Sequence, residues 1–269
     1  MKKILFTDLD GTLLKNDKTI SDKNCEAIQR MLEEGHYVVV ATGRPVESGF
    51  QVVKKLGLTM PGCYMIAFNG AVVYDCSADC TLAERTLPIE YVEYLFEEAH
   101  KYGIHIQTYS KTHLLTQNQD EELEFYTRTT KMPYKLVNNV FDALEAEPNK
   151  VLLASLHEPE KLLQFQKDHM EWERGRCNSF FSCKEYLEYC PKDTDKGSGI
   201  HYLSEFLNVD IENTYAVGDE RNDIPMLKAA GMGIAMKNAV EEAKQAADYV
   251  TECDNEHDAI AEIIEKFIL

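Results

Sequence analysis

Two carboxylates separated by a single residue follow the first apolar run of the chain. Asp8 and Asp10 stand in the segment Asp8-Leu9-Asp10-Gly11-Thr12, directly after an expected strand at Lys3–Thr7. Carboxylates this close repel each other unless a proton or a cation separates them. A divalent ion with oxygen ligands meets that need, and magnesium is the usual ion beside phosphate. The segment therefore predicts a catalytic metal site, with an acidic turn at a strand exit as the plainer alternative.

A second group of acidic side chains follows an apolar run near the other end of the chain. The segment Val217-Gly218-Asp219-Glu220-Arg221-Asn222-Asp223 lies where a strand is expected to turn into a helix. Asp219 and Asp223 are four residues apart, a spacing that suits a magnesium site in which one group supports the other. Acidic residues at a helix start can also be simple partners of the helix dipole.

Two further segments contain groups that could hold a phosphate. In Ala41-Thr42-Gly43-Arg44-Pro45, a hydroxyl and a glycine amide precede a helix, and such groups can bind phosphate oxygens. In Asp195-Lys196-Gly197, a lysine at a helix start could neutralise phosphate charge. Taken singly, the first segment could be an ordinary strand–helix turn and the second could carry a solvent-exposed lysine.

The elements expected to position these groups alternate between strands and helices in the amino-terminal part. They are the strand Lys3–Thr7, the helix Ser21–Glu34, the strand Tyr37–Ala41, the helix Val46–Leu56, and the strands Tyr64–Phe68 and Ala71–Tyr74. Asn69-Gly70 between the last two strands is a strong hairpin signal. The alternation predicts a parallel sheet with right-handed crossovers, and ligands bind beyond the carboxyl ends of such strands.

The carboxy-terminal part repeats this alternation, whereas the middle of the chain does not. The expected carboxy-terminal elements are the helix Lys196–Phe206, the strand Thr214–Val217, the helix Asn222–Ala230, the strand Gly233–Met236, the helix Glu241–Ala247, the strand Tyr249-Val250 and the helix His257–Phe267. Those of the middle are the helix Pro88–Tyr102, the strands Ile104–Tyr109, Leu114–Thr116 and Lys150–Leu156, the helix Pro159–Met170, and the strands Ser179–Ser182 and Tyr186–Tyr189. The last two strands alternate as in a half-exposed antiparallel sheet. We therefore expect an α/β domain at 1–82 and 191–269, interrupted by an α+β insert at 83–190.

The charge of the chain excludes several classes of partner. Its 269 residues include 46 Asp and Glu against 28 Lys and Arg, a net charge of −18. Binding to nucleic acid needs clustered cations, and an acidic surface repels anionic membranes. No run approaches the roughly 18 apolar residues of a membrane helix, and Asp8 and Asp10 interrupt the opening apolar run too early for a signal peptide. We expect a cytoplasmic protein whose partner is a small molecule, neither nucleic acid nor membrane, with the oligomeric state left open.

The chain contains eight cysteines and no C-x-x-C pair. A chain this long does not need disulfides to stabilise its fold, so we expect reduced cysteines that pack as small apolar side chains. A zinc site through Cys76 and Cys80 is the alternative, and their spacing fits it poorly.

Taken together, the four polar segments resemble the four motifs of the haloacid dehalogenase superfamily of phosphotransferases. In that comparison Asp8-Leu9-Asp10-Gly11-Thr12 resembles the first motif, Thr42 the second, Lys196 the third, and Gly218-Asp219 with Asn222-Asp223 the fourth. The insert lies between the second and third motifs, as in members with the second type of cap, class IIB. Phe68-Asn69-Gly70-Ala71 is most similar to the Cof-type sugar phosphatases.

The resemblance implies a Rossmann-like parallel-sheet core with an inserted cap, and a role for each motif residue. Asp8 would attack phosphorus and form an aspartyl-phosphate, while Asp10 would protonate the leaving alcohol and then activate water. Magnesium would be held by the Asp8 carboxylate, the Asp10 backbone carbonyl and Asp219, with Asp223 supporting its bound water. Phosphate oxygens would be held by the Leu9 amide, Thr42, Gly43, Lys196 and Asn222. Asn69 and Arg44 would line the site from the core.

The implied activity is that of a magnesium-dependent phosphatase acting on small phosphorylated metabolites, sugar phosphates above all. The resembling ion-pumping ATPases carry Thr at the position of Asp10, so the acid at this position favours hydrolysis. Two alternatives remain: a phosphomutase or phosphoryl transferase with the same intermediate, and a non-catalytic protein that binds phosphorylated ligands. The insert would act as a lid that selects the leaving group. Its candidate polar groups are Arg128, Tyr126, Lys184, Tyr189 and Lys192.

Overall fold

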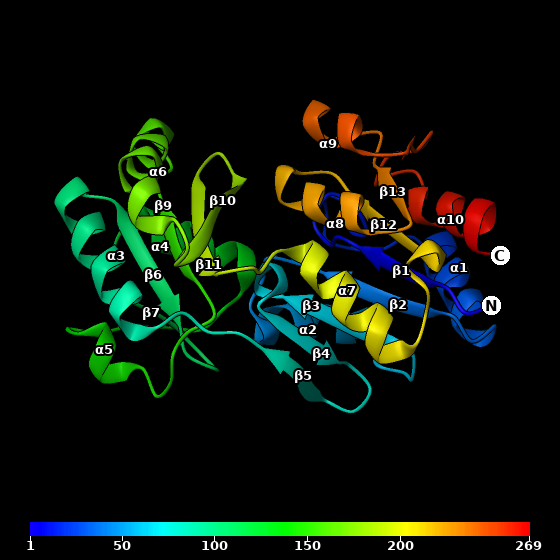
Figure 1. The fold of residues 1–269 in the computed structure, drawn as a ribbon, viewed down its shortest axis with the longest axis horizontal. Helices are drawn as coiled ribbons and strands as arrows, with labels where there is room; N and C mark the ends of the chain where they lie inside the picture. Colours follow the sequence, from blue (N-terminus) through cyan, green and yellow to red (C-terminus); the bar gives the residue numbers. More distant parts are fainter. The chain divides into compact units, whose positions relative to one another are not determined.

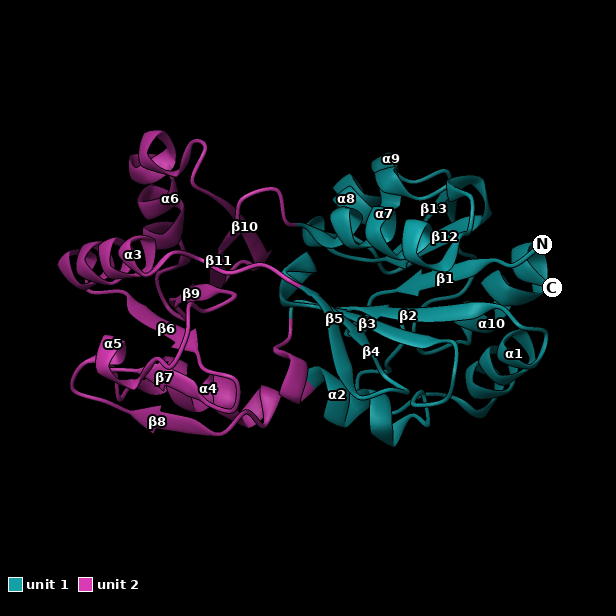
Figure 2. Ribbon diagram, turned by 60° about the horizontal axis from the view of Figure 1, so that its bottom comes forward, with its two compact units in different colours: residues 1–43, 49–83, 195–269 teal, residues 44–48, 84–194 magenta.

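The computed structural model describes residues 1–269 and divides the chain into two compact units (Figure 2). The first unit contains Met1–Gly43, Gly49–Ala83 and Asp195–Leu269. The second contains Glu84–Thr194 together with the short segment Arg44–Ser48. The second unit is therefore mainly one insertion into the first, and Arg44–Ser48 is a contribution to it that the sequence did not predict.

The first unit is built on an eight-stranded sheet with the order β14-β13-β12-β1-β2-β3-β4-β5 (Figure 1). Its strands are β1 (Ile4–Thr7), β2 (Tyr37–Ala41), β3 (Cys63–Ala67), β4 (Val72–Asp75), β5 (Cys80–Glu84), β12 (Thr214–Gly218), β13 (Met232–Ala235) and β14 (Tyr249–Val250). The strands from β14 to β3 pair in parallel, and β4 reverses against β3. In the central strand β1 all residues are buried, as expected where helices cover both faces of a parallel sheet.

Helices cover both faces of this sheet (Figure 1). They are α1 (Asp22–Glu33), α2 (Val46–Lys55), α7 (Lys196–Leu207), α8 (Ile224–Ala229), α9 (Glu241–Ala246) and α10 (Ala259–Ile263). Helix α1 packs with α10, and α7 packs with α8. The chain leaves β1 toward β2 and β3, whereas β12, β13 and β14 extend the sheet on the other side of β1. The carboxyl ends of β1 and β12 thus form a switch point of the topology, where open α/β sheets bind ligands.

The second unit has a six-stranded, largely antiparallel sheet with the order β10-β11-β9-β6-β7-β8. Its strands are β6 (His105–Tyr109), β7 (Leu114–Thr116), β8 (Tyr134–Leu136), β9 (Val151–Ala154), β10 (Cys177–Cys183) and β11 (Tyr186–Pro191), and its helices are α3 (Ile89–Tyr102), α4 (Glu121–Thr130), α5 (Val140–Ala143) and α6 (Pro159–Glu173). Leu95 of α3 and Phe165 of α6 are buried in one core with Ile106, Leu153 and Tyr189 of the sheet. This unit therefore has a hydrophobic core of its own.

The predicted α/β fold class is confirmed, and the differences concern short or exposed elements. The sequence did not predict β5, α4, β8 or α5. Strand β8 is exposed along its length and β5 is largely so, hence neither carries an apolar pattern. The predicted helix at 222–230 is a 3₁₀ turn, Arg221–Asp223, followed by α8. The predicted helix at 257–267 is α10 followed by a π-helical turn, Ile264–Ile268.

None of the helices in the structure combines the length and the hydropathy needed to span a bilayer.

A buried ion pair crosses the sheet of the second unit. Lys150 Nζ lies 3.0 Å from Glu188 Oε2, and the two side chains are 1% and 5% exposed. The Ser182 hydroxyl donates to the other carboxylate oxygen at 2.8 Å. Burial by itself lowers the pKa of the Lys150 ammonium, but the charge and hydrogen bond of Glu188, together with Tyr126 and Cys190, raise it above its usual value. Each charge is thus stabilised by the other.

We expect Lys150→Met to lower the free energy of unfolding by about 3–5 kcal/mol, because it leaves the Glu188 carboxylate buried without its counter-charge. The double variant Lys150→Met/Glu188→Leu should recover most of that loss, because apolar side chains of similar volume replace a desolvated pair. Urea unfolding of the three proteins measures both effects. A double variant no more stable than the single one would contradict this account of the pair.

Candidate active site

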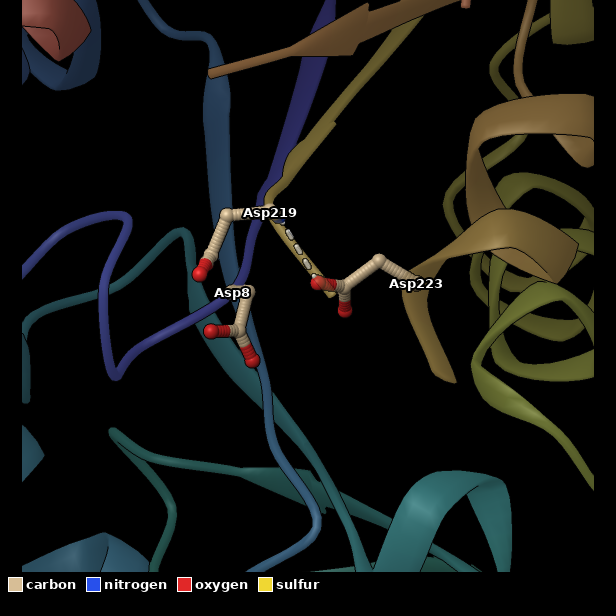
Figure 3. Close-up of side chains that lie close together, drawn as sticks. All are labelled: Asp8, Asp219 and Asp223. Carbon is tan, nitrogen blue, oxygen red and sulfur yellow. Dashed lines mark hydrogen bonds between the residues drawn. The ribbon is translucent and has the colours of Figure 1, made fainter. Parts of the chain in front are cut away.

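The register of β1 and β12 brings acidic residues from the two ends of the chain to one place. Thr7 pairs with Val217, and the backbone N–H of Asp8 donates to the Val217 carbonyl at 2.9 Å. Asp8 and Asp219 therefore leave the sheet at the same edge. Carboxylate oxygens of Asp8, Asp219 and Asp223 all lie within 4.8 Å of one another, and the three residues are buried (Figure 3).

Lys196 supplies the positive charge of this cluster. It is the first residue of α7, which Asp195 caps by accepting a hydrogen bond from the Ser198 N–H at 2.8 Å. The lysine is 1% exposed, so it is not the solvated lysine of the plainer interpretation. Its ammonium donates to Asp8 Oδ1 at 2.6 Å and to Asp223 Oδ1. Burial lowers the pKa of Lys196, but the charges of Asp223 and Asp8 overcome this and raise it.

Asp223 organises the loop that follows β12. Its Oδ1 faces Lys196. Its Oδ2 accepts from the backbone N–H of Asp219 at 2.9 Å (Figure 3) and from the backbone N–H of Glu220 at 3.0 Å. A Cβ at Gly218 would lie 2.5 Å from Asp223 Cβ and Cγ, so only glycine permits this close approach. Both oxygens of Asp223 are thus used to orient neighbouring groups, as a supporting residue requires.

The electrostatics of the cluster favour an added cation. Burial, more than any neighbour, raises the pKa of Asp8 well above its usual value; Lys196 opposes this rise, and the charges of Asp223 and Asp219 add to it. Burial and the Asp223 charge raise the pKa of Asp219 to about 7. A divalent ion would offset the mutual repulsion of these carboxylates.

The donor atoms also fit such an ion. Asp8 accepts from Lys196 through Oδ1, and Asp219 accepts from the Thr12 hydroxyl through Oδ1 at 2.6 Å. The Oδ2 atom of each carboxylate can therefore face an ion. A buried set composed only of oxygen atoms suits magnesium among the common metals. The residues present thus fit the predicted cofactor.

The residues predicted to hold phosphate lie together in the first unit. Thr42 is buried, its N–H donates to the Ile66 carbonyl at 2.8 Å, and its own carbonyl accepts from the Asn69 N–H at 3.1 Å. Asn222 Nδ2 donates to Asn69 Oδ1 at 3.2 Å. A Cβ at Gly43 would meet the Asn69 carboxamide at 3.0 Å. The loops that follow β2, β3 and β12 therefore meet at Asn69.

Two residues of the first motif stand apart from the buried carboxylates. The side chain of Asp10 is 38% exposed, and its Oδ1 accepts from Lys18 Nζ at 2.8 Å. Leu9 is buried, and its carbonyl accepts from the Leu14 N–H at 2.8 Å. The turn after β1 thus sends alternate side chains into different environments: Asp8 into the cluster and Asp10 toward solvent.

Arg44 and Tyr189 both belong to the second unit. Arg44 begins the segment Arg44–Ser48, which belongs to the second unit, and its role as a residue that lines the site stays a prediction. Burial raises the pKa of Tyr126, and the Arg44 charge opposes this rise. Tyr189, a candidate lid group, is fully buried in the core of the second unit and serves packing. The other lid candidates divide into buried Tyr126 and exposed Arg128, Lys184 and Lys192.

Three contacts at the site were not predicted. Thr12 lies inside the first motif, and its position there could have suggested a role. The Lys18–Asp10 ion pair had no signal in the sequence, because it depends on how residues 11–20 fold back. Gly70 has a φ of +104°, and a Cβ there would lie 2.0 Å from the Asp195 carbonyl oxygen. The turn after β3 is thereby packed against the residue that caps the helix of Lys196.

The family model of the haloacid dehalogenase-like hydrolases matches residues 5–264, nearly the whole chain. This chain belongs to that family. The family predicted from the four motifs is thereby confirmed, and with it the prediction that the chain is a hydrolase. The match spans both units, so the insert is part of the family's architecture.

Individual relatives align over the full length. A 5-amino-6-(5-phospho-D-ribitylamino)uracil phosphatase of Bacillus subtilis is 30% identical, with 98% of this chain and 97% of the relative covered. A pyridoxal phosphate phosphatase of Escherichia coli is 29% identical, with 97% of each chain covered. The crystal structure of a haloacid dehalogenase-like hydrolase from Bacteroides thetaiotaomicron superimposes with a TM-score of 0.90 at 32% identity, covering 100% of both chains.

We expect Asp223→Ala to lower the free energy of unfolding by about 3–5 kcal/mol, because it removes one of the two carboxylates beside buried Lys196. The same change leaves two backbone N–H groups without their acceptor. Asp223→Asn keeps an acceptor oxygen for those N–H groups and should lose less. Chemical denaturation of the variants measures the difference.

Asp248→Ala is the matched control in the same unit. Asp248 Oδ2 accepts from the Gly233 N–H at 2.9 Å, so its loss removes a backbone acceptor without exposing a buried lysine. This variant should cost about 1 kcal/mol. Equal losses for Asp223→Ala and Asp248→Ala would show that the Lys196 pair adds nothing to stability.

Proposed function

We propose that this protein is a magnesium-dependent phosphatase that hydrolyses small phosphorylated metabolites through an aspartyl-phosphate on Asp8. The observation that carries the proposal is the position of the Lys196 ammonium, 2.6 Å from the Asp8 carboxylate inside a buried acidic cluster. A carboxylate is a poor nucleophile toward a phosphate dianion, because the two anions repel each other. A fixed cation beside the nucleophile reduces that repulsion where it opposes the reaction.

The reaction has two displacements at phosphorus. In the first, a carboxylate oxygen of Asp8 forms a bond to phosphorus while the bond from phosphorus to the substrate oxygen breaks, and Asp10 gives its proton to that oxygen. In the second, Asp10 accepts a proton from water as the water oxygen attacks phosphorus. The bond from phosphorus to Asp8 then breaks, and inorganic phosphate leaves.

The two aspartates suit these roles because their surroundings differ. Asp8 is buried and held by Lys196 through one oxygen, which fixes the direction of the other. Asp10 is partly exposed beside Lys18, so water can approach it for the second step. Two carboxylates kept in unlike environments can perform unlike tasks at the same pH.

Magnesium would be held by the Asp8 carboxylate, the Asp10 backbone carbonyl and Asp219, with Asp223 as the supporting carboxylate. The ion supplies positive charge that neutralises the phosphate oxygens and the cluster itself. The remaining phosphate contacts would come from Lys196, the Thr42 hydroxyl, the Gly43 and Leu9 amides, and Asn222. Lys196 is already placed at Asp8, so one residue can contact both the nucleophile and the phosphate.

The substrate class is proposed from the relatives and the insert. The names of two relatives describe phosphatases of a ribitylamino-uracil phosphate and of pyridoxal phosphate, so a shared phosphate chemistry accommodates different leaving groups. We assign catalysis to a core formed by 1–82 and 191–269. We propose that the insert 83–190 selects the leaving group, which resembles a sugar. The eight free cysteines of the whole chain suit a reducing compartment, so the proposal extends to a cytoplasmic enzyme.

Asp8→Asn tests the nucleophile. The amide is nearly isosteric but cannot form the phosphoenzyme, so release of inorganic phosphate from a panel of metabolite phosphates should fall to background. The melting temperature should remain near that of the wild type, because the amide oxygen can still accept from Lys196 and loss of the Asp8 charge relieves its repulsion with Asp219 and Asp223. Substantial phosphate release by the variant would remove Asp8 from this role. Isomerised substrate without phosphate release by the wild type would identify a phosphoryl transferase instead.

Removal of divalent ions tests the cofactor. An excess of chelator should abolish phosphate release, and magnesium should restore it, because the carboxylate cluster then regains its counter-charge. Magnesium at 100 times its dissociation constant should also stabilise the wild type by about 2.7 kcal/mol. Asp219→Asn should lose this stabilisation. Full activity in excess chelator would rule out the metal role.

A further inference from the structure

Asn69 lies where three loops of the first unit meet. It contacts Thr42 and Asn222, neither of which belongs to the turn between β3 and β4. We infer that Asn69 is a positioning residue that sets the geometry of the Thr42-Gly43 loop and of Asn222 around the bound phosphate. The inference rests on the proposed function, which assigns phosphate contacts to those two loops. It gives Asn69 a role through its neighbours, where the sequence suggested a hairpin turn and a residue lining the site.

The backbone around Asn69 is held in an unfavourable conformation. Phe68, Asn69 and Gly70 all have positive φ, at 49°, 52° and 104°. Asparagine and glycine tolerate the left-handed region, but an aromatic residue such as phenylalanine rarely adopts it. Strained backbone of this kind persists only where the surrounding structure enforces it, and it concentrates at functional sites. The turn between β3 and β4 is thus shaped by its neighbours and is not a relaxed two-residue hairpin.

The contacts of Asn69 show what enforces this shape. Its N–H donates to the Thr42 carbonyl at 3.1 Å, and its Oδ1 accepts from Asn222 Nδ2 at 3.2 Å. Its carboxamide lies 3.0 Å from where a Gly43 Cβ would stand. The residue is 1% exposed. One buried side chain therefore contacts the loop after β2 and the loop after β12 at the same time.

These contacts predict a catalytic consequence. A carboxamide that donates one N–H to a fixed acceptor has its plane and its second N–H oriented. Asn69 Oδ1 thereby aims the second N–H of Asn222, while its backbone contact holds Thr42 at a set distance from β3. Loss of positioning at a reacting centre can reduce the rate by as much as two orders of magnitude, with little change in the fold.

Asn69→Gly tests the side chain apart from the backbone, because glycine adopts the left-handed conformation without strain. With magnesium present, we expect kcat/KM for p-nitrophenyl phosphate to fall, and the inhibition constant of inorganic phosphate to rise, each on the order of tenfold. The melting temperature should change no more than in the control Asn208→Gly. Asn208 is an exposed asparagine with a φ of 51° at the end of α7, outside the site.

Kinetic constants of Asn69→Gly equal to those of the control would overturn the inference. So would an Asn69→Gly chain that fails to fold, because the carboxamide would then be a requirement of the fold. Asn222→Ala and the double variant complete a cycle: if Asn69 acts through Asn222, the double variant should lose little more than Asn222→Ala alone. Losses that add in full would overturn the inference, because Asn69 would then act independently of Asn222.

The cycle also separates this inference from the proposed function. If the wild type releases no phosphate from any phosphate ester, the proposed function fails. The rise in melting temperature caused by inorganic phosphate then replaces kinetics as the readout. A smaller rise in Asn69→Gly than in Asn208→Gly still supports the positioning role, and equal rises overturn it.

Discussion

The site depends on one interaction: a buried lysine held between two buried carboxylates. Lys196 would be too costly to bury alone, and Asp8 and Asp223 would repel each other without it. Because the three residues come from the end of β1, the loop after β12 and the start of α7, their charge balance fixes how these segments meet. Asp219 adds a third carboxylate at the same place, and this excess negative charge accounts for the affinity for a cation that we propose.

The sheet topology makes this meeting possible. Parallel strands put their carboxyl ends at one edge, and the chain continues from β1 to β2 on one side of β1 whereas β12 lies on the other side. Close backbone approaches then complete the site. Gly218 makes room for Asp223, and Gly70 lets the turn after β3 lie against Asp195, the cap of the helix that begins at Lys196. These two glycines are needed because a side chain at either position would collide with a neighbouring residue.

The turn after β1 separates two acidic residues that the sequence presents as a pair. Asp8 enters the buried cluster, whereas Asp10 faces Lys18 and solvent. A nucleophile benefits from fixed surroundings, and a group that must both donate and accept a proton benefits from access to water. The contrast follows from local backbone geometry, because only one residue lies between them.

The sequence alone determined the fold class, the family, the main strands and helices of both units, and the residues gathered at the site. Two features of the sequence supported these predictions. Apolar runs indicated the buried strands, and polar groups directly after those runs indicated the site. The tertiary structure alone decided that Lys196 is buried between Asp8 and Asp223, that Asp10 pairs with Lys18, and that Arg44 belongs to the second unit. Such pairings join residues far apart in the chain or fix the direction of a side chain. Periodicity and spacing describe only local order, so only the packed chain can settle them.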